Sequence, residues 1–345
     1  MTVSLAIKYR PAIWDDVTEQ SAIKTILTQQ LSTKTFKHAY LFCGPAGCGK
    51  TTCARIFANE INAGLGNPIE LDAASNNGVD DVRNIIQQSK TQSLDSEYKI
   101  FIIDECHALS NSAWQAMLKI IEEPPAKSIF IFCTTDPQKI PRTIISRVQR
   151  YDFQRISQNG IFDRLMKILQ MEDIPQLQGN SLVNAVEYIA KIADGGMRDA
   201  ITLLDKCLSY SSDLTLENVV KALGTVDYSM MFTFTDYVLT GKAEAIIETI
   251  EDLYNTGIDL KQFVKLYIGF ILELNKYLLG CDWTYINIPA IEQNKVALSK
   301  FKESDYNKLL HLLRTLIKLD ADIKYSSTVK SDIEAIMLLE LDGEY

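Results

Sequence analysis

A glycine-rich segment, Gly44-Pro-Ala-Gly-Cys-Gly-Lys-Thr51, has residue types and a spacing that suit the binding of a phosphate chain. It matches the pattern GxxxxGK[ST] in full, and its glycines would let backbone N–H groups curl around phosphates without Cβ clashes. Lys50 would reach the β and γ phosphates, and the Thr51 hydroxyl would bind Mg²⁺. A chance glycine-rich turn is the alternative, but a strand before the segment and a helix after it favour a phosphate site. The nucleotide contacts expected here are Gly44, Pro45, Ala46, Gly47, Cys48, Gly49, Lys50, Thr51 and Thr52.

Two acids, Asp104 and Glu105, follow the apolar run Ile100–Ile103. The carboxyl end of such a strand is where an open α/β sheet presents its ligand-binding groups. Asp104 would hold the metal ion, directly or through a water molecule, and Glu105 would polarise the attacking water. The alternative is a pair of solvent-facing acids. His107 completes the string Asp-Glu-Cys-His, and a structural or coupling role is favoured for it over catalysis.

A third polar group follows the apolar strand 128–135, which ends in Thr134-Thr135-Asp136. A hydroxyl at this point could orient the lytic water between two neighbouring strands. The competing interpretation is that a threonine only caps the following loop. Thr135 is therefore a candidate for contact with the reacting groups.

These residues need a sheet whose strand ends meet, and the hydrophobic pattern predicts one. Short apolar runs alternate with amphipathic stretches up to residue 155, and runs that are apolar on both faces are typical of central parallel strands. This pattern indicates an α/β sheet with right-handed crossovers, the fold class of P-loop NTPases. The expected strands are 39–43, 69–73, 100–103, 128–135 and 151–153, and the expected helices are 51–62, 79–92 and 110–123 with Ser110 as N-cap.

After residue 156 the pattern becomes helical. Residues 227–345 are predicted to be helical except for turns near 255–258 and 280–289, and one amphipathic stretch places Leu309, Leu313, Leu316 and Ile317 on a core-facing stripe. The predicted domains are a nucleotide-binding domain at 1–155, a small helical lid domain at 156–225 and an all-helical collar domain at 226–345. Helices of the lid are expected at 156–173, 181–194 and 197–210.

The composition excludes several classes of protein. The chain of 345 residues has no apolar run long enough to span a membrane and does not begin with a secretory signal. Its seven cysteines form no CxxC pair, which disfavours a disulfide scaffold and fits a reducing cytosol. Cys43, Cys48 and Cys53 recur every five residues, but their expected places on a strand end, a loop and a helix favour simple packing over a metal site.

The net charge of −9 argues against a protein that binds polyanions through bulk charge. The charge is nevertheless uneven. Residues 1–155 hold 17 basic and 16 acidic residues, whereas residues 156–345 hold 18 basic and 28 acidic ones. The segment 139–150 has four basic residues and no acid, so any contact with phosphates is expected in the first half of the chain.

Several strings occur together in an order that is typical of one family. They are Lys8-Tyr-Arg-Pro11, Trp14-Asp-Asp-Val17 with Glu19-Gln20, the glycine-rich segment, Glu70-Leu-Asp-Ala-Ala-Ser75-Asn, Asp104-Glu-Cys-His107, Glu122-Glu-Pro-Pro125, Thr134-Thr-Asp-Pro-Gln-Lys139 and Ser146-Arg147. This set closely resembles the AAA+ ATPase subunit of DNA sliding-clamp loaders. It is nearest to the gamma/tau subunits of bacterial DNA polymerase III and more distant from replication factor C small subunits. The resemblance is dense over 5–153, thinner over 154–225, where Gly195-Gly-Met-Arg198-Asp-Ala200 fits, and only architectural beyond 226.

The resemblance implies ATP and Mg²⁺ as ligands and assigns further residues to the site. Lys8, Tyr9, Arg10 and Pro11 would line the adenine side of the pocket. Thr135 aligns with the first sensor of the family, and Arg198, from the lid, with the second sensor, which touches the γ-phosphate. Arg147 would be an arginine finger that reaches the ATP of a neighbouring subunit, so that one subunit alone is catalytically incomplete.

The resemblance also implies partners. The subunits, identical or similar, would form a head-to-tail ring or spiral, expected to be pentameric, held together by the collar helices. ATP binding would order this spiral so that it opens a sliding clamp and grips a primer–template junction, and hydrolysis would release the closed clamp. DNA would be held through backbone phosphates, for which the candidate residues are Asn76, Asn77, Arg83 and Lys139.

The sequence departs from the family pattern at two points and also stops short. The stretch Ile61–Pro68 lacks the four cysteines of the usual zinc knuckle, so zinc is not expected, and Val148 replaces the cysteine after Ser146-Arg147. The chain stops at residue 345 without the long tail of the tau form, which fits a compact version from a bacterium or from a phage or plasmid in a bacterial host. Two alternatives remain: another AAA+ DNA-remodelling ATPase, such as a branch-migration motor, and a nucleotide-gated scaffold subunit that does not hydrolyse ATP.

Overall fold

The chain is divided into two compact units by the contacts between its Cα atoms. The computed structural model describes residues 3–91, 93, 95–172, 180–223, 228–289 and 292–342. Unit 1 comprises Met1–Leu214 and unit 2 comprises Thr215–Tyr345. The finer division into three domains, with boundaries after residues 155 and 225, stays a prediction.

Unit 1 contains a five-stranded parallel sheet with the strand order β2-β3-β4-β1-β5. In the sheet register Cys43 is paired with Thr134, and Asp72 with Asp104, so the polar residues that end these strands lie along one edge. The strands are β1 (Ala39–Cys43), β2 (Ile69–Asp72), β3 (Lys99–Asp104), β4 (Ser128–Thr134) and β5 (Gln149–Asp152).

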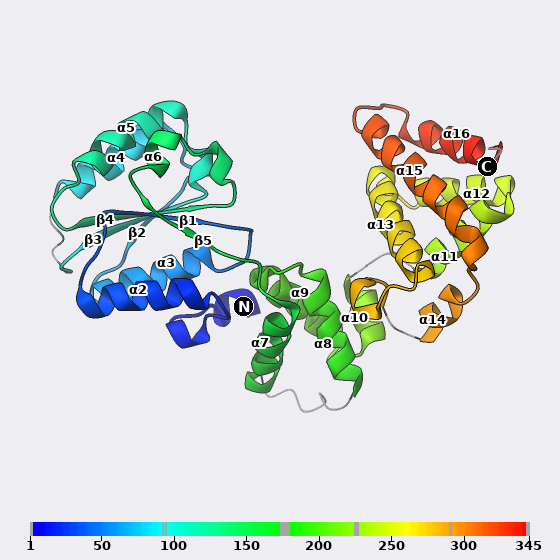
Figure 1. Ribbon diagram of the computed structural model, residues 1–345, viewed down its shortest axis with the longest axis horizontal. Coiled ribbons are helices and arrows are strands. Elements are labelled where there is room, and N and C mark those ends of the chain that lie inside the picture. The colour runs from blue at the N-terminus through cyan, green and yellow to red at the C-terminus, as the bar shows by residue number, and fades with distance from the viewer. Residues whose placement is uncertain are drawn as a thin grey trace. The chain divides into compact units, whose positions relative to one another are not determined.

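Each face of the sheet is covered by helices, which explains why the central strands are apolar on both sides (Figure 1). Tyr40 and Phe42 of β1 pack into the core on one face, where α2 and α3 lie, whereas Leu41 packs into the core on the other face, where α4, α5 and α6 lie. These helices are α2 (Ser21–Thr33), α3 (Lys50–Ile61), α4 (Val79–Ser89), α5 (Asn111–Glu122) and α6 (Arg142–Ile145). Short 3₁₀ helices in this part are η1 (Trp14–Asp16), η2 (Cys106–Ala108) and η3 (Pro137–Lys139).

Helix α5 shows how the local sequence sets the ends of an element. Its N-cap is Ser110, whose hydroxyl accepts a hydrogen bond from the Ala113 amide at 3.2 Å, as the sequence predicts. The helix ends at Glu122, just before Pro124, because the backbone preceding a proline disfavours the helical conformation.

Among the residues that the structure describes, three helices follow β5 in unit 1, and the N-terminal segment contacts this group. They are α7 (Gln158–Met171), α8 (Asn180–Ile192) and α9 (Met197–Tyr210). Helix α1 (Leu5–Lys8) packs against α9, and the Leu5 amide donates to Asp205 Oδ2 at 3.1 Å. The Ser157 hydroxyl caps α7 by accepting from the Gly160 amide at 3.0 Å.

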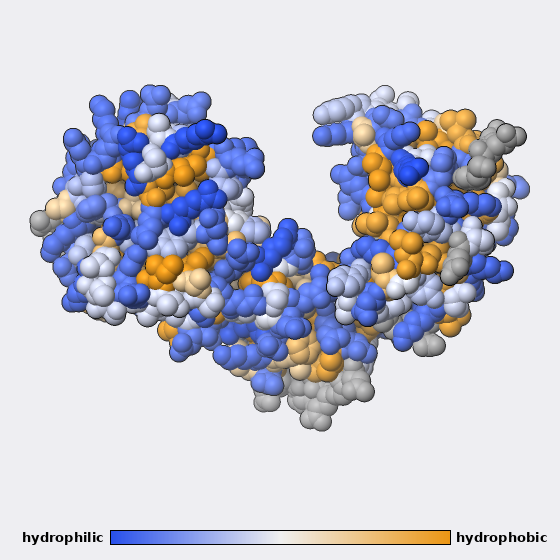
Figure 2. Space-filling view, in the orientation of Figure 1, coloured by the Kyte–Doolittle hydropathy of each residue, from blue (hydrophilic) through white to orange (hydrophobic). Residues whose placement is uncertain are grey.

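The regular elements of unit 2 are all helices in the residues that the structure describes, and most of the buried apolar side chains of this unit form one cluster. Figure 2 shows that apolar side chains also reach the viewed surface of this unit. On α13, Leu266 and Leu272 are exposed. The helices are α10 (Leu216–Leu223), α11 (Tyr228–Thr240), α12 (Ala243–Asn255), α13 (Leu260–Leu278), η4 (Trp283–Tyr285), α14 (Glu292–Leu298), η5 (Glu303–Asp305), α15 (Tyr306–Ile323) and α16 (Val329–Asp342).

The prediction that Ile317 faces the core is wrong, because the core-facing side of α15 is spaced differently. Leu309 and Leu316 are buried as expected and Leu313 packs against the core, but Ile317 is 54% exposed. The core-facing stripe of α15 instead also contains Leu312, Leu319 and Ile323, so that its buried residues follow one another at intervals of three or four positions. Among the helices that the structure describes, none is long and apolar enough to cross a membrane.

Candidate nucleotide-binding site

The glycine-rich segment forms a tight loop between β1 and α3. Gly44 has φ +150°, and a Cβ atom there would lie 2.6 Å from the Phe153 carbonyl oxygen, so a side chain cannot be accommodated. Gly49, at φ +101°, turns the chain into α3. The ammonium of the buried Lys50 donates to the carbonyls of Gly44 at 2.8 Å and Pro45 at 2.7 Å. These two hydrogen bonds hold the ammonium against the first residues of the loop.

The start of α9 packs directly on this loop. The Met197 amide donates to the Gly47 carbonyl at 3.0 Å, and a Cβ atom on Gly47 would lie 3.0 Å from the Cα of Gly196. Two glycines therefore allow the backbones to approach this closely. The contact brings Arg198, one residue further along α9, into the wall of the cavity described below.

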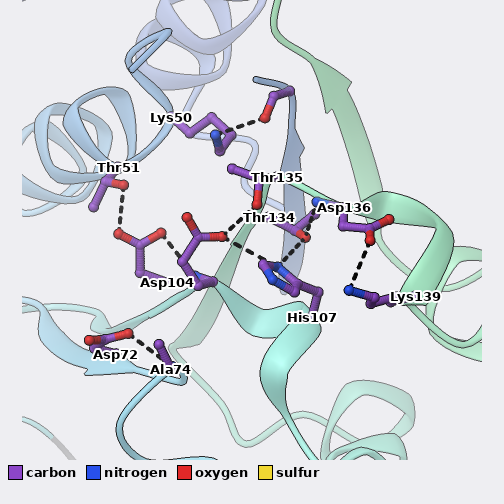
Figure 3. Close-up of polar contacts among 12 residues, drawn as sticks. Lys50, Thr51, Asp72, Ala74, Asp104, His107, Thr134, Thr135, Asp136 and Lys139 are labelled. Carbon is purple, nitrogen blue, oxygen red and sulfur yellow. Dashed lines mark hydrogen bonds and ion pairs between the residues drawn. The ribbon is translucent and has the colours of Figure 1, made fainter. Parts of the chain in front are cut away.

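Asp104 connects the loop helix to Glu105. Its Oδ2 accepts from the Thr51 hydroxyl at 2.7 Å, and its Oδ1 accepts from the Glu105 amide at 3.0 Å (Figure 3). Thr51 and Asp104 thus present two oxygen ligands side by side. Oxygen is the donor that Mg²⁺ prefers, so the residues present fit this ion.

Glu105 lies between two polar side chains from neighbouring elements. Its Oε2 accepts from the Thr135 hydroxyl at 3.0 Å and lies 3.3 Å from His107 Nδ1. Glu105 itself has φ +46°, a backbone conformation that is unusual for a residue with a side chain. Strained backbone of this kind is concentrated at functional sites.

These groups surround a cavity of about 440 Å³ in unit 1. Most of the predicted nucleotide contacts line it, and the structure brings them together from the N-terminal segment, the glycine-rich loop, the end of β3 and the start of α9. The predicted residues in the lining are Tyr9, Arg10, Pro11, Ala46, Gly47, Cys48, Gly49, Lys50, Thr51, Thr52, Asp104, Glu105 and Arg198.

Five of the residues predicted for the nucleotide site lie outside this lining. The carbonyl groups of Gly44 and Pro45 accept hydrogen bonds from the Lys50 ammonium, and the Thr135 hydroxyl donates to Glu105 Oε2. Lys8 does not line the cavity as the resemblance implied. Its ammonium instead lies 2.7 Å from Glu172 Oε1, at the end of α7. This interaction raises the pKa of Lys8. The fifth residue, Arg147, is described below.

Arg10 enters the cavity from the N-terminal segment. Its Nε donates to the Thr52 hydroxyl at 3.3 Å. Burial lowers the pKa of Arg10, and the nearby charges of Arg55 and Arg198 act in the same direction, whereas Glu70 and Asp104 oppose it. Arg10 and Arg198 both line the cavity, and positive charges gathered in this way suit a polyanionic ligand.

Sequence reasoning missed part of the cavity. Arg164 of α7 is buried, and its guanidinium donates to Asp16 Oδ1 and to the Tyr9 carbonyl, both at 3.1 Å. A buried arginine with such partners fixes the N-terminal segment on the lid helices. No local motif marks it, because its partners lie about 150 positions away in the chain. The other unpredicted lining residues are Ser4, Ala6, Ile7, Asp16, Val17, Thr18, Ile156, Met197, Asp199, Ile201 and Thr202.

Arg147 lies between α6 and β5. Its Nε and Nη2 both contact Glu122 Oε1 at 2.8 Å, and its Nη1 donates to the Thr143 carbonyl at 2.8 Å and to the Ser146 hydroxyl at 3.1 Å. Arg147 is 40% exposed. The predicted finger is therefore an accessible side chain whose contacts in this chain are with its own neighbours.

The four candidate DNA contacts are exposed but lie on two separate segments. Asn76 and Asn77 follow β2, and Arg83 lies on α4 and pairs with Asp80 at 2.9 Å. Lys139, on η3, pairs with Asp136 at 3.2 Å (Figure 3). Their roles stay predictions.

The cysteines pack as the sequence indicates. Cys43, Cys48 and Cys53 are buried and free, and burial raises the pKa of all three thiols, to about 11 for Cys43 and about 12 for Cys53. Over the part of the chain that the structure describes, there is no group of three or more His, Cys, Asp or Glu side chains that could hold a metal ion. The expectation of no zinc stays a prediction.

Three domain models match consecutive parts of the chain. Residues 67–157 match the delta subunit of DNA polymerase III, and residues 160–213 match the ATPase lid domain of a DNA polymerase III clamp loader subunit. Residues 214–339 match domain III of DNA polymerase III subunits gamma and tau.

Individual relatives agree with these matches. The DNA polymerase III subunit tau of Bacillus subtilis is 38% identical over 291 residues, which cover 78% of this chain and 51% of that protein. Subunit tau of Escherichia coli is 30% identical, covering 82% of this chain and 48% of its own length. The chain thus spans about half the length of the curated relatives it matches.

Solved structures show the fold. RuvB of Thermotoga maritima, a Holliday junction branch migration motor, superposes with a TM-score of 0.53 at 18% identity, covering 73% of this chain and 86% of that chain. At this identity the likeness extends to the fold and no further.

Proposed function

Because this chain belongs to the family of DNA polymerase III gamma and tau subunits, we propose that it is the ATPase subunit of a complex that loads a sliding clamp onto primer–template DNA. One observation supports the ATPase assignment above all. Thr51, Asp104 and Glu105 are joined by hydrogen bonds at the wall of a cavity that Lys50 and Arg198 also line. This set would supply the phosphate-binding, metal-binding and water-activating groups that hydrolysis of a nucleoside triphosphate needs.

In this assignment the residues of one chain bind ATP and prepare the water. Lys50 and the loop amides would hold the β and γ phosphates, and Arg198 would contact the γ-phosphate from the lid. Thr51 and Asp104 would hold Mg²⁺, whose charge neutralises the phosphate chain. Glu105 would accept a proton from water as the water oxygen bonds to the γ-phosphorus and ADP departs with the electrons of the broken bond. Thr135 would position Glu105.

The site would be completed by a second chain. Arg147 lies outside the lining of the cavity, so it would act on the ATP of a neighbouring subunit in a head-to-tail assembly. We assign residues 1–155 to nucleotide binding, 156–225 to the lid and 226–345 to the collar that joins the subunits. A pentameric ring, DNA contacts through Asn76, Asn77, Arg83 and Lys139, and a place in the bacterial cytoplasm complete the proposal.

The proposal is tested by measuring ATP hydrolysis by the full chain in its assembly, alone and with sliding clamp and primer–template DNA. Hydrolysis should rise when both are present, because the clamp and the junction stabilise the assembled spiral. Blunt duplex DNA of the same length is the matched control. Hydrolysis that neither ligand stimulates would overturn the assignment, and DNA unwinding or translocation would favour a different AAA+ motor.

A further inference from the structure

The lining of the nucleotide cavity has two chemically different parts. The glycine-rich loop and the end of β3 contribute groups that suit phosphates and a metal ion, namely Lys50, Thr51 and Asp104. The N-terminal segment and the lid helices add apolar side chains, which are Tyr9, Pro11, Val17, Ile156 and Ile201 among others. Apolar lining fits the faces of a base, so the nucleoside part of ATP would lie against this second part.

Arg164 of α7 holds the N-terminal segment at two points. One guanidinium nitrogen donates to Asp16 Oδ1 and another donates to the Tyr9 carbonyl, both at 3.1 Å. Tyr9 is the C-cap of the short helix α1, and a carbonyl at the end of a helix lacks a partner within that helix. Figure 1 shows the start of the chain beside α7 and α9. The arginine therefore connects the lid to the segment that carries the apolar lining.

Burial distinguishes Arg164 from the second cation at Asp16. Lys167, three residues further along α7, also contacts Asp16 Oδ1 at 3.1 Å, but its side chain is 56% exposed. The side chain of Arg164 is only 8% exposed. An ion pair that water reaches contributes little, whereas the loss of one partner from a buried pair leaves the other without compensation. Arg164 is thus the residue whose loss would release the segment.

We infer that Arg164 is a positioning residue for ATP binding, which holds the Tyr9 carbonyl and the Asp16 carboxylate and so keeps the N-terminal lining in place for the nucleoside part of ATP. This inference rests on the proposed ATPase function. Arg164 acts through the N-terminal segment and not on the phosphates, which the glycine-rich loop would hold.

The effect on affinity follows from how often the N-terminal lining is in place. The apparent affinity of a ligand falls in proportion to the fraction of chains whose site is already formed. Without the guanidinium, the segment would be in place in only a fraction of the chains, and ATP would have to order it on binding. A ligand made of phosphates alone would bind at the loop, so this loss would leave its affinity unchanged.

The test compares ATP with inorganic tripolyphosphate, which has linked phosphates and no nucleoside. Arg164→Met keeps an apolar side chain and removes both donors. Lys167→Met is the matched control, because it removes a cation from the same Asp16 oxygen and leaves the Tyr9 carbonyl paired. Each variant is studied as the full chain with Mg²⁺, and displacement of a fluorescent ATP analogue gives the Kd for both ligands.

A positioning role predicts a loss that is specific for ATP. Arg164→Met should raise the Kd for ATP about 10-fold and leave the Kd for tripolyphosphate within about two-fold of wild type. Lys167→Met should leave both values within about two-fold. Arg164→Lys should restore part of the ATP affinity, because an ammonium lacks the fork that reaches two acceptors. If Arg164→Met does not fold, Arg164→Lys replaces it, with an expected rise of about three-fold or more for ATP alone.

Three results would overturn the inference while the proposed function stands. One is an Arg164→Met chain that binds ATP as tightly as wild type. Another is an equal rise of the Kd for both ligands, which would mean that Arg164 contacts the phosphates or supports the whole cavity. The third is an equally large rise for ATP in Lys167→Met, which would assign the effect to the charge at Asp16. A wild-type chain that binds no ATP would instead overturn the proposed function and this inference with it.

Discussion

The nucleotide cavity and the surroundings of Arg147 are two polar regions of unit 1 that are built differently. In the cavity, Thr51, Asp104 and Glu105 bind one another and face a common space. Around Arg147, the guanidinium contacts Glu122 and Thr143, and none of these residues lines the cavity. The first region surrounds a cavity within one chain, whereas the second is an exposed side chain that contacts residues of its own surface.

This difference teaches that binding and catalysis can be assigned to different chains. In the proposed function, Lys50, Thr51, Asp104 and Glu105 would all act in the cavity of one chain, so one chain would bind a nucleotide alone. The charge that develops on the γ-phosphoryl group would be neutralised further by Arg147 of a neighbouring chain, since Arg147 lies outside the cavity of its own chain. Variants in the two regions should therefore fail in different ways.

The largest effect is expected from Lys50→Ala. Removing the ammonium eliminates charge-assisted hydrogen bonds to the phosphates, each worth about 1.5–3 kcal/mol, so the affinity for ATP should fall about 100-fold or more. Hydrolysis should be lost with it. Titration of a fluorescent ATP analogue measures the affinity, and exposed Lys37→Ala, which removes a lysine remote from the cavity lining, is the matched control. Tight binding by Lys50→Ala would contradict the placement of the phosphates.

Arg147→Ala should separate the two regions. ATP affinity should stay within about two-fold of wild type, while hydrolysis by the assembly should fall about 10³-fold, because an arginine supplied in trans is worth about 10³–10⁵ in rate. The same fluorescent titration and a steady-state phosphate assay measure the two quantities.

Mixing Arg147→Ala chains with Lys50→Ala chains gives the control. Some interfaces then pair an intact loop with an intact arginine, so the mixture should regain part of the activity that neither variant has alone. If the mixture stays inactive while both variants still assemble, Arg147 acts within its own chain and the comparison between the two regions fails.

Much of the cavity could be predicted from the sequence because its chemistry lies in short strings. Gly44–Thr51 and Asp104-Glu105 each combine a strand end with the polar groups that follow it, and parallel strands bring those ends to one edge. The strands themselves could also be predicted, because runs such as Ile100–Ile103 are apolar at every position and are buried on both faces of the sheet. Helix α2 was not predicted, because only Ile23 and Leu27 of its thirteen residues are buried.

Long-range pairing is the part that the sequence could not supply. Arg164 is an ordinary basic residue of an amphipathic helix until the fold places it beside Asp16, 148 positions earlier. Lys8 belongs to a recognisable string, yet its pairing with Glu172 depends on how α7 packs on the N-terminal segment. The pairing of Arg147 with Glu122 could not be predicted for the same reason, because Glu122 is the last residue of α5 and lies 25 positions earlier in the chain.

Of the substitutions considered, a change at Glu122 is expected to have the smallest effect on ATP hydrolysis. Glu122 is 47% exposed and Arg147 is 40% exposed, and an ion pair this accessible to solvent contributes about 0–1 kcal/mol. Glu122→Gln should therefore change the hydrolysis rate of the assembly by less than about five-fold, and upward, because Arg147 exchanges a neutral amide rather than a carboxylate for the γ-phosphate of the neighbouring chain. The adjacent exposed Glu123→Gln is the matched control and should have no effect. A fall as large as that of Arg147→Ala would show instead that Glu122 builds the catalytic position of the arginine, and the two regions would then be equally preorganised.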